Sequence, residues 1–126
     1  MNKKVIGAVL SATMIMTGGT TVLASGAAEG KTFAIVTKAA GNPYNEKEAD
    51  GFKEAIEDEG GKVIIKHPET ATADAQISVV QSLISQEVDA ICIAGNDENA
   101  LQACLSEAMD VGIKVSCLDA KVNPAS

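Results

Sequence analysis

A cation, an amide and an aromatic ring stand close together in the loop from residue 38 to residue 45. They are Lys38, Asn42 and Tyr44. Sugars bind to such mixtures, because their hydroxyls need hydrogen-bond donors and acceptors while their ring carbons pack on a flat apolar face. A solvated lysine in a turn beside a packing tyrosine is an equally good interpretation of these residue types. The loop lacks the glycine spacing of a dinucleotide-binding loop, so a nucleotide cofactor is not expected there.

Two later loops carry polar side chains directly after an apolar run. In the segment 95–99, Asn96 or Asp97 is expected first of all to cap the following helix, although a capping side chain can still face a ligand. This segment resembles a calcium loop but lacks that motif's glycine and its distant glutamate. Asp119 follows the apolar run that ends at Leu118. Its carboxylate can accept hydrogen bonds from two sugar hydroxyls at once, or it can be a simple turn residue.

Catalytic and metal-binding patterns are not found in the sequence. His67 is the only histidine, and no nearby residue completes a metal-binding or catalytic set, so a surface or turn role is favoured. Cys92, Cys104 and Cys117 lie in apolar surroundings at spacings of 12 and 13, which match no zinc site. We predict buried free thiols, with a disulfide between two of them as the less favoured alternative. The sequence therefore predicts no catalytic residue, no metal and no cofactor.

Composition restricts the class of protein further. The net charge of −7 argues against nucleic acid as a partner, because phosphates need a positive face, and it suits a freely diffusing protein. Hydrophobic residues make up 46% of the chain, enough for a packed core, so disorder is not expected. Aromatic residues make up only 2%, so that core must be aliphatic.

Residues 1–24 have the three parts of a secretory signal peptide. Lys3 and Lys4 give the positive start, 5–16 is an apolar run, and 22–24 ends in small residues suited to cleavage. The apolar run is too short to span a membrane, which takes about 20 residues. No cysteine for lipid attachment follows it. We therefore expect a periplasmic or extracellular protein that is not membrane-embedded after signal cleavage.

Strand-like and helix-like segments alternate after a flexible lead-in at 25–31. The pattern predicts strands at 33–37, 62–66, 90–94 and 113–118, and helices at 45–59, 74–86 and 98–111. Asn45 is expected to cap the first helix, with Glu48 completing a capping box. The order β-α-β-α-β-α-β, with short apolar strands, predicts an α/β fold in which a parallel sheet is covered by helices on both faces. Ligands bind such sheets at the carboxyl ends of the strands, which selects the loops described above.

With these elements in place, residues 32–119 resemble the start of the periplasmic sugar-binding proteins of ABC transporters, the ribose- and galactose-binding type. The resemblance rests on 33–38 (Phe-Ala-Ile-Val-Thr-Lys), 41–44 (Gly-Asn-Pro-Tyr), 51–55 (Gly-Phe-Lys-Glu-Ala), 89–94 (Asp-Ala-Ile-Cys-Ile-Ala) and 112–119 (Gly-Ile-Lys-Val-Ser-Cys-Leu-Asp). Within that group the chain looks most similar to the rhamnose- and autoinducer-2-binding branch, in which a lysine closes the first strand.

The resemblance implies which residues bind and what they bind. Lys38 and Asp119 match ligand-contacting positions, and Asn42 and Tyr44 match positions that hydrogen-bond and stack on sugar; with Asn96 they are the ligand-binding candidates. Where relatives have an arginine or an Asp-Ser-Asp-like run after the aspartate, this chain has Ala-Lys, so rhamnose-like and autoinducer-2-like ligands both stay open.

For the whole protein, the resemblance implies capture of a small sugar, delivery to the membrane permease of an ABC transporter, and no catalysis. The family has two lobes, so we expect residues 32–126 to be a partial N-terminal sugar-binding lobe, with the second lobe absent. The alternative is an extracellular sugar-sensing domain of a chemoreceptor or sensor kinase.

Overall fold

The computed structural model describes residues 26–123, and strands and helices alternate along them as the sequence predicts. The strands are β1 (Thr32–Val36), β2 (Lys62–Lys66), β3 (Ala90–Ile93) and β4 (Lys114–Cys117). The helices are α1 (Pro43–Asp58), α2 (Ala73–Ser85) and α3 (Gln102–Asp110). The predicted signal peptide, residues 1–24, lies outside the described residues. Within 26–123, no helix is long and apolar enough to cross a membrane.

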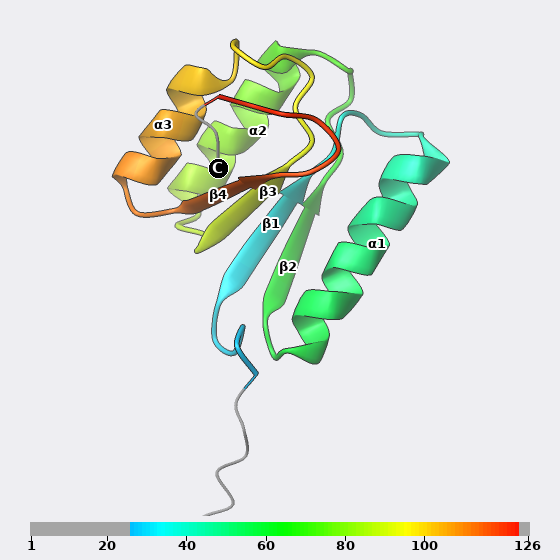
Figure 1. Cartoon of the computed structure of the whole chain (residues 1–126), viewed down its shortest axis with the longest axis vertical. Coiled ribbons are helices and arrows are strands. Elements are labelled where there is room, and N and C mark those ends of the chain that lie inside the picture. Colours follow the sequence, from blue (N-terminus) through cyan, green and yellow to red (C-terminus); the bar gives the residue numbers. More distant parts are fainter. Residues whose placement is uncertain (1–25, 124–126) are drawn as a thin grey trace, which may run out of the picture.

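The four strands form one parallel sheet in the order β2-β1-β3-β4 (Figure 1). From β1 the chain continues to β2 at one edge of the sheet, then crosses back past β1 to β3 and on to β4. Because β-α-β crossovers are right-handed, this reversal places α1 on one face of the sheet and α2 and α3 on the other. The predicted α/β class is therefore confirmed. The carboxyl ends of β1 and β3, which we call the switch point, are where such sheets bind ligands.

The main core lies between the sheet and the layer formed by α2 and α3. Alternate strand residues point into it, as a parallel sheet buried on this face requires. They meet side chains from both helices, and the buried set is aliphatic, as the composition predicts; it includes Val36, Val80, Leu83, Ile91, Ile93, Leu101 and Leu105. On the other face α1 packs mainly on β1 and β2, with Ala49 fully buried.

The first helix begins earlier than predicted. It starts at Pro43, and its cap is Asn42, whose Oδ1 accepts a hydrogen bond from the Tyr44 backbone N–H at 2.9 Å. The predicted capping box of Asn45 and Glu48 is therefore wrong. Proline explains the difference, because its fixed φ suits the first helical position and its missing N–H costs nothing there. Asn45 instead lies in the first turn of α1, where it is buried and its Nδ2 donates to the Ala39 carbonyl at 2.9 Å.

The third helix is shorter than predicted, while the other boundaries shift little. A turn at 98–101 precedes α3, and the Asp97 carboxylate accepts the backbone N–H groups of Asn99 and Ala100 at 2.9 and 2.8 Å. A side chain that satisfies free N–H groups of a turn in this way delays the regular helix. β2 has its predicted bounds, and α2 and the ends of the other strands differ by one residue.

The described part of the lead-in is attached at the amino end of β1 and β2. Residues 26–30 form a turn, and Ala28 is buried. The backbone N–H of Ala28 donates to the Glu59 carbonyl at 3.3 Å, and the N–H of Ala27 donates to Glu59 Oε2 at 3.1 Å. No local sequence pattern predicts these contacts, because they depend on where α1 ends.

The three cysteines are free thiols. Cys92 and Cys104 are buried and Cys117 is partly buried, as expected for small apolar side chains. Burial raises the pKa of the Cys92 and Cys104 thiols, so both stay protonated at neutral pH.

Candidate functional site

Lys38 and Asp119 meet at the carboxyl edge of the sheet. Lys38 follows β1 and Asp119 follows β4, and Lys38 Nζ lies 2.8 Å from Asp119 Oδ2. Because β3 lies between those two strands, the ion pair spans the end of β3, beside the switch point. The side chains are 38% and 34% exposed, so both remain reachable from solvent. The structure therefore pairs the side chains of two of the five predicted ligand-binding residues.

Asp119 has an unusual backbone conformation. Its φ is 59°, in the left-handed region, which aspartate and asparagine adopt more readily than other side chains with a Cβ. The conformation turns the chain directly after β4 and leaves the carboxylate on the edge where Lys38 arrives. Residue type and backbone shape thus agree at this position.

Asn96 belongs to the same edge but is occupied with the backbone. Its Nδ2 donates to the carbonyl of Lys38 at 2.8 Å, and its own backbone N–H donates to Gln76 Oε1 at 2.8 Å. Asp97, rather than Asn96, satisfies the turn before α3. Within residues 26–123, the Oδ1 of Asn96 has no hydrogen bond and is left to accept one. Asn96 thereby holds the main chain that carries the Lys38 side chain.

Asn42 and Tyr44 lie where the same edge meets the start of α1. The Oδ1 of Asn42 is used as the helix cap, which leaves its Nδ2 as a donor. Tyr44 is 59% exposed, so its ring presents an open flat face. Asn42 ends the loop that starts with Lys38 and Tyr44 lies in the first turn of α1, but within the described residues neither forms a hydrogen bond with the ion pair.

Glu48 is a charged group at this edge that the sequence analysis treated only as a capping partner. Its Oε2 is buried without a hydrogen-bond partner among the described residues. Burial is the main cause that raises the pKa of Glu48; the negative charge of Asp119 adds to it, and the positive charge of Lys38 opposes it. The carboxyl therefore responds to both members of the ion pair. Only the fold reveals this, because Glu48 is on a helix and its partners follow strands.

Gln76 is a second residue that the sequence analysis missed. It lies near the start of α2 and is completely buried. Its Nε2 donates to the carbonyls of Thr37 and Ala94 at 3.1 and 2.7 Å, and its Oε1 accepts from Asn96. A sequence signal existed: Gln76 is four residues before Val80 and seven before Leu83, and thus lies on the apolar stripe of the helix.

His67 follows β2 and contacts Thr37, the residue directly after β1. Its Nδ1 lies 2.8 Å from Thr37 Oγ1, and Thr37 is fully buried. This contact ties the end of β2 to the end of β1. His67 thus has a structural partner and lies, partly buried, in the irregular segment after β2 rather than in a turn or on the open surface.

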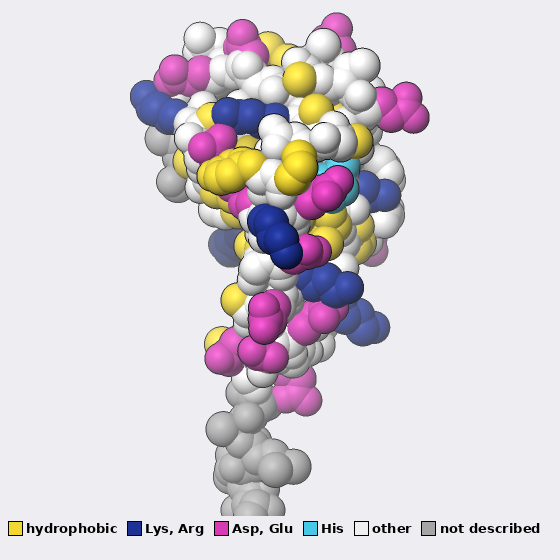
Figure 2. All heavy atoms as spheres, turned by 90° about the vertical axis from the view of Figure 1, so that its right-hand side faces the viewer, with side chains coloured by type: hydrophobic (Ala, Val, Ile, Leu, Met, Phe, Trp, Pro, Cys, Tyr) yellow, Lys and Arg dark blue, Asp and Glu magenta, His cyan; other side chains and the backbone are white. Residues whose placement is uncertain are grey.

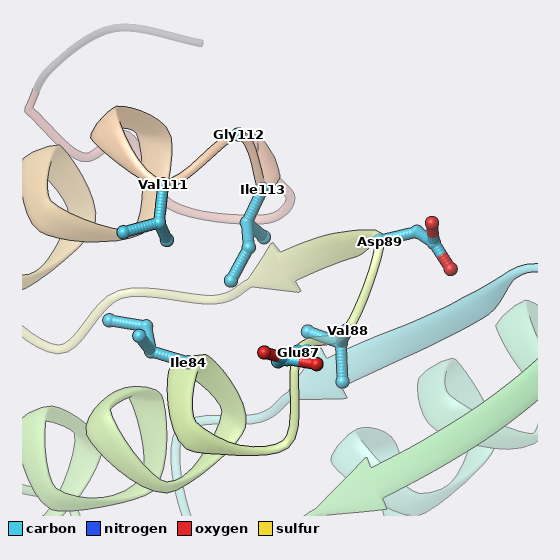
Figure 3. Close-up of a pocket in the computed structure, with 7 residues that line it drawn as sticks. All are labelled: Ile84, Glu87, Val88, Asp89, Val111, Gly112 and Ile113. Atoms are coloured by element: carbon cyan, nitrogen blue, oxygen red, sulfur yellow. The ribbon is translucent and has the colours of Figure 1, made fainter.

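A cavity of about 370 Å³ lies at the opposite, amino end of the strands. Ile84 from α2 and Val111 and Ile113 from the turn before β4 point toward one another across it, whereas Asp89 points away (Figure 3). The Asp89 carboxylate instead accepts the Thr32 backbone N–H at 2.7 Å. The lining of the cavity is mostly aliphatic and has no cation or aromatic ring. For a polar ligand, the edge with Lys38 and Asp119 is the better site.

Acidic and basic side chains are mixed on the face of the molecule shown in Figure 2. Figure 2 shows the side that carries α1, where acidic side chains occur along its whole length with basic ones among them. Such a mixed surface agrees with the net charge of −7. It differs from the continuous positive face that phosphate backbones require.

Residues 33–126 match the periplasmic binding protein domain family. The chain belongs to this family. The match covers the sheet, all three helices and the edge with Lys38 and Asp119, so the resemblance inferred from the sequence is confirmed. Among curated protein sequences, none matched the chain.

Solved structures of periplasmic binding proteins support the same assignment. An ABC transporter solute-binding protein from Clostridium phytofermentas, solved with bound L-rhamnose, is 50% identical with a TM-score of 0.75, over 76% of this chain and 30% of that chain. LsrB from Clostridium saccharobutylicum, solved in complex with AI-2 (autoinducer-2), is 30% identical with a TM-score of 0.71, over 74% and 28%. A solute-binding protein from Burkholderia graminis, solved with D-arabinose, is 26% identical with a TM-score of 0.69, over 75% and 32%. This periplasmic binding protein domain thus spans about 30% of its relatives' length.

Proposed function

We propose that this domain is part of an extracytoplasmic solute-binding protein that captures a small sugar and delivers it to the membrane permease of an ABC transporter. The observation that carries the proposal is the Lys38–Asp119 pair at the carboxyl edge of the sheet. The rhamnose-bound relative, at 50% identity, supports a six-carbon deoxysugar, and the AI-2-bound relative keeps that ligand as the second possibility. The residues that precede the lobe, 1–24, have the pattern of an export signal, and export is part of the proposal.

The ion pair is suited to a ligand rich in hydroxyl groups. An ammonium group donates three hydrogen bonds and a carboxylate accepts several, so each can bind a hydroxyl and keep its partner. A hydroxyl both donates and accepts, and it can therefore bridge Lys38 Nζ and Asp119 Oδ2. The exposed ring of Tyr44 supplies a face for the C–H groups of a sugar, and the free Oδ1 of Asn96 supplies another acceptor.

One edge of one sheet gives only one wall of a binding site. Pockets that bind small molecules enclose most of the ligand surface. The relatives are about two and a half times as long as this chain, and we propose that their additional length corresponds to the second wall, in the form of a second lobe. Residues 26–123 alone are accordingly expected to bind sugar weakly.

Thermal-shift measurements on the complete gene product would test the proposal. We would titrate L-rhamnose, AI-2, D-arabinose and D-ribose, with sucrose as an osmolyte control. One sugar should raise the melting temperature in a saturable way, since a ligand at 100 times its Kd adds about 2.7 kcal/mol of stability. If none of the sugars stabilises the protein beyond the sucrose control, the proposed function is wrong.

A further inference from the structure

The two strands at the switch point diverge directly after their last shared hydrogen bond. That bond joins the Ala94 backbone N–H to the Val36 carbonyl at 2.9 Å. Beyond it, β1 leads to α1 on one face and β3 leads to α3 on the other, so the carbonyls of Thr37 and Ala94 cannot pair with each other's strand. Buried carbonyls without partners are costly, and a sheet that divides in this way needs another donor.

Gln76 supplies that donor from the start of α2. A side-chain amide has the same donor and acceptor groups as a peptide bond, and Gln76 uses them as the missing ladder would. Its two N–H groups reach one carbonyl from each diverging strand, Thr37 and Ala94, at 3.1 and 2.7 Å. Its Oε1 accepts the Asn96 backbone N–H at 2.8 Å. A fully buried glutamine on an otherwise apolar stripe is stable only because all these groups are paired.

The same contacts lead to the ion pair. Asn96, held by Gln76, donates through Nδ2 to the carbonyl of Lys38 at 2.8 Å. Lys38 follows Thr37, whose carbonyl Gln76 also holds. The main chain that carries the Lys38 ammonium group is therefore fixed from both sides.

We infer that Gln76 is the positioning residue of the proposed sugar site: its buried amide holds the loops after β1 and β3 so that Lys38 and Asn96 present their polar groups together beside Asp119. The inference depends on the proposed function for its ligand but on the observed hydrogen bonds for its geometry. Gln76 touches no ligand itself. It acts through Asn96 and the backbone of Lys38.

Hydrogen exchange on the unmodified protein tests the geometry without any sugar. The Asn96 backbone N–H lies outside the β-ladder, yet it should exchange as slowly as amides inside β3, because Gln76 holds it. In Gln76→Met, which keeps the approximate length but loses the hydrogen bonds, this amide should exchange at least about tenfold faster than in the wild type. An unprotected Asn96 amide in the wild type would overturn the inference, and it would do so whether or not any sugar binds.

Calorimetry on the complete gene product tests the consequence for binding. Gln76→Glu keeps the shape and the Oε1 acceptor, and its carboxyl can donate one hydrogen bond when protonated but none when ionised. For each pH we would divide the affinity of Gln76→Glu for the stabilising sugar by that of the wild type. This relative affinity should be at least about tenfold lower at pH 8 than at pH 5. Gln86→Glu is the matched control: it lies at the end of the same helix, where, among residues 26–123, Gln86 Nε2 bonds only to Ser82. Its relative affinity should not change with pH.

Circular dichroism at each pH separates positioning from stability. The affinities should differ while both variants are fully folded, because positioning changes the site and not the folded fraction. If the affinity of Gln76→Glu follows only its folded fraction, or equals the wild type at both pH values, Gln76 is a structural residue and the inference is wrong. Failure of the wild type to bind any sugar would contradict the proposed function, and the exchange result would still decide the role of Gln76.

Discussion

Replacing Asp119 with asparagine should separate ligand binding from stability. The pair with Lys38 is short, at 2.8 Å, but both side chains are about a third exposed. Ion pairs that water can screen contribute about 0 to 1 kcal/mol, so the free energy of unfolding should fall by less than about 1 kcal/mol. Asparagine is chosen over alanine because the φ of 59° at this position favours Asp or Asn. The backbone turn after β4 is therefore kept while the charge is removed.

The effect on binding should be much larger. A hydrogen bond to a charged group contributes about 1.5 to 3 kcal/mol, which corresponds to about 10- to 150-fold in Kd. Isothermal titration calorimetry with the stabilising sugar measures this loss, and urea unfolding measures the stability change on the same samples.

A neighbouring ion pair gives the matched control. Lys121 Nζ lies 2.9 Å from Glu98 Oε1, a pair of similar length and greater exposure. Glu98→Gln removes one negative charge in the same way and should leave the Kd within about twofold of the wild type. If Asp119→Asn also stays within twofold, or if Glu98→Gln weakens binding equally, the carboxylate of Asp119 is not a ligand contact and the reasoning is refuted.

Three further substitutions test the fold and the electrostatics. In urea unfolding, Glu48→Gln should stabilise the protein more at pH 7 than at pH 4. Because the pKa of Glu48 is raised in the folded state, that state binds the proton more tightly, and the wild type loses stability as pH rises through that pKa. An equal effect of the substitution at both pH values would contradict the raised pKa. Leu83→Ala removes a fully buried core side chain and should cost about 2 to 5 kcal/mol by the same measurement; a cost below 1 kcal/mol would mean that α2 does not pack as described. Gly95→Ala should cost about 1 to 3 kcal/mol, because the added Cβ would clash with Val122 Cγ1; an unchanged urea midpoint would contradict that close contact.

The fold could be predicted from the sequence because each element carries a local pattern. Short β-branched and aliphatic runs alternate with helical stripes such as the one through Val80 and Leu83, and this order admits few arrangements. The helix ends were harder, because they depend on competing caps. Asn42 and Asn45 are both good caps by residue type, and only the proline between them decides which is used.

The site could be predicted in part. Lys38 and Asp119 each follow an apolar strand, and the rule that ligands bind at carboxyl ends places both on one edge. Their 2.8 Å contact could not be predicted, because it depends on the strand order, in which only β3 lies between β1 and β4. Glu48 and Gln76 were missed because they are on helices, and their roles come from strand ends that are distant in sequence.

The most direct measurement is a crystal structure of the complete gene product with the sugar that stabilises it. We predict sugar hydroxyl oxygens within about 3 Å of Lys38 Nζ and of the Asp119 carboxylate, with Gln76 still bonded to Thr37 and Ala94. A sugar that contacts neither Lys38 nor Asp119, or that lies at the amino end of the strands beside Ile84, would contradict the account.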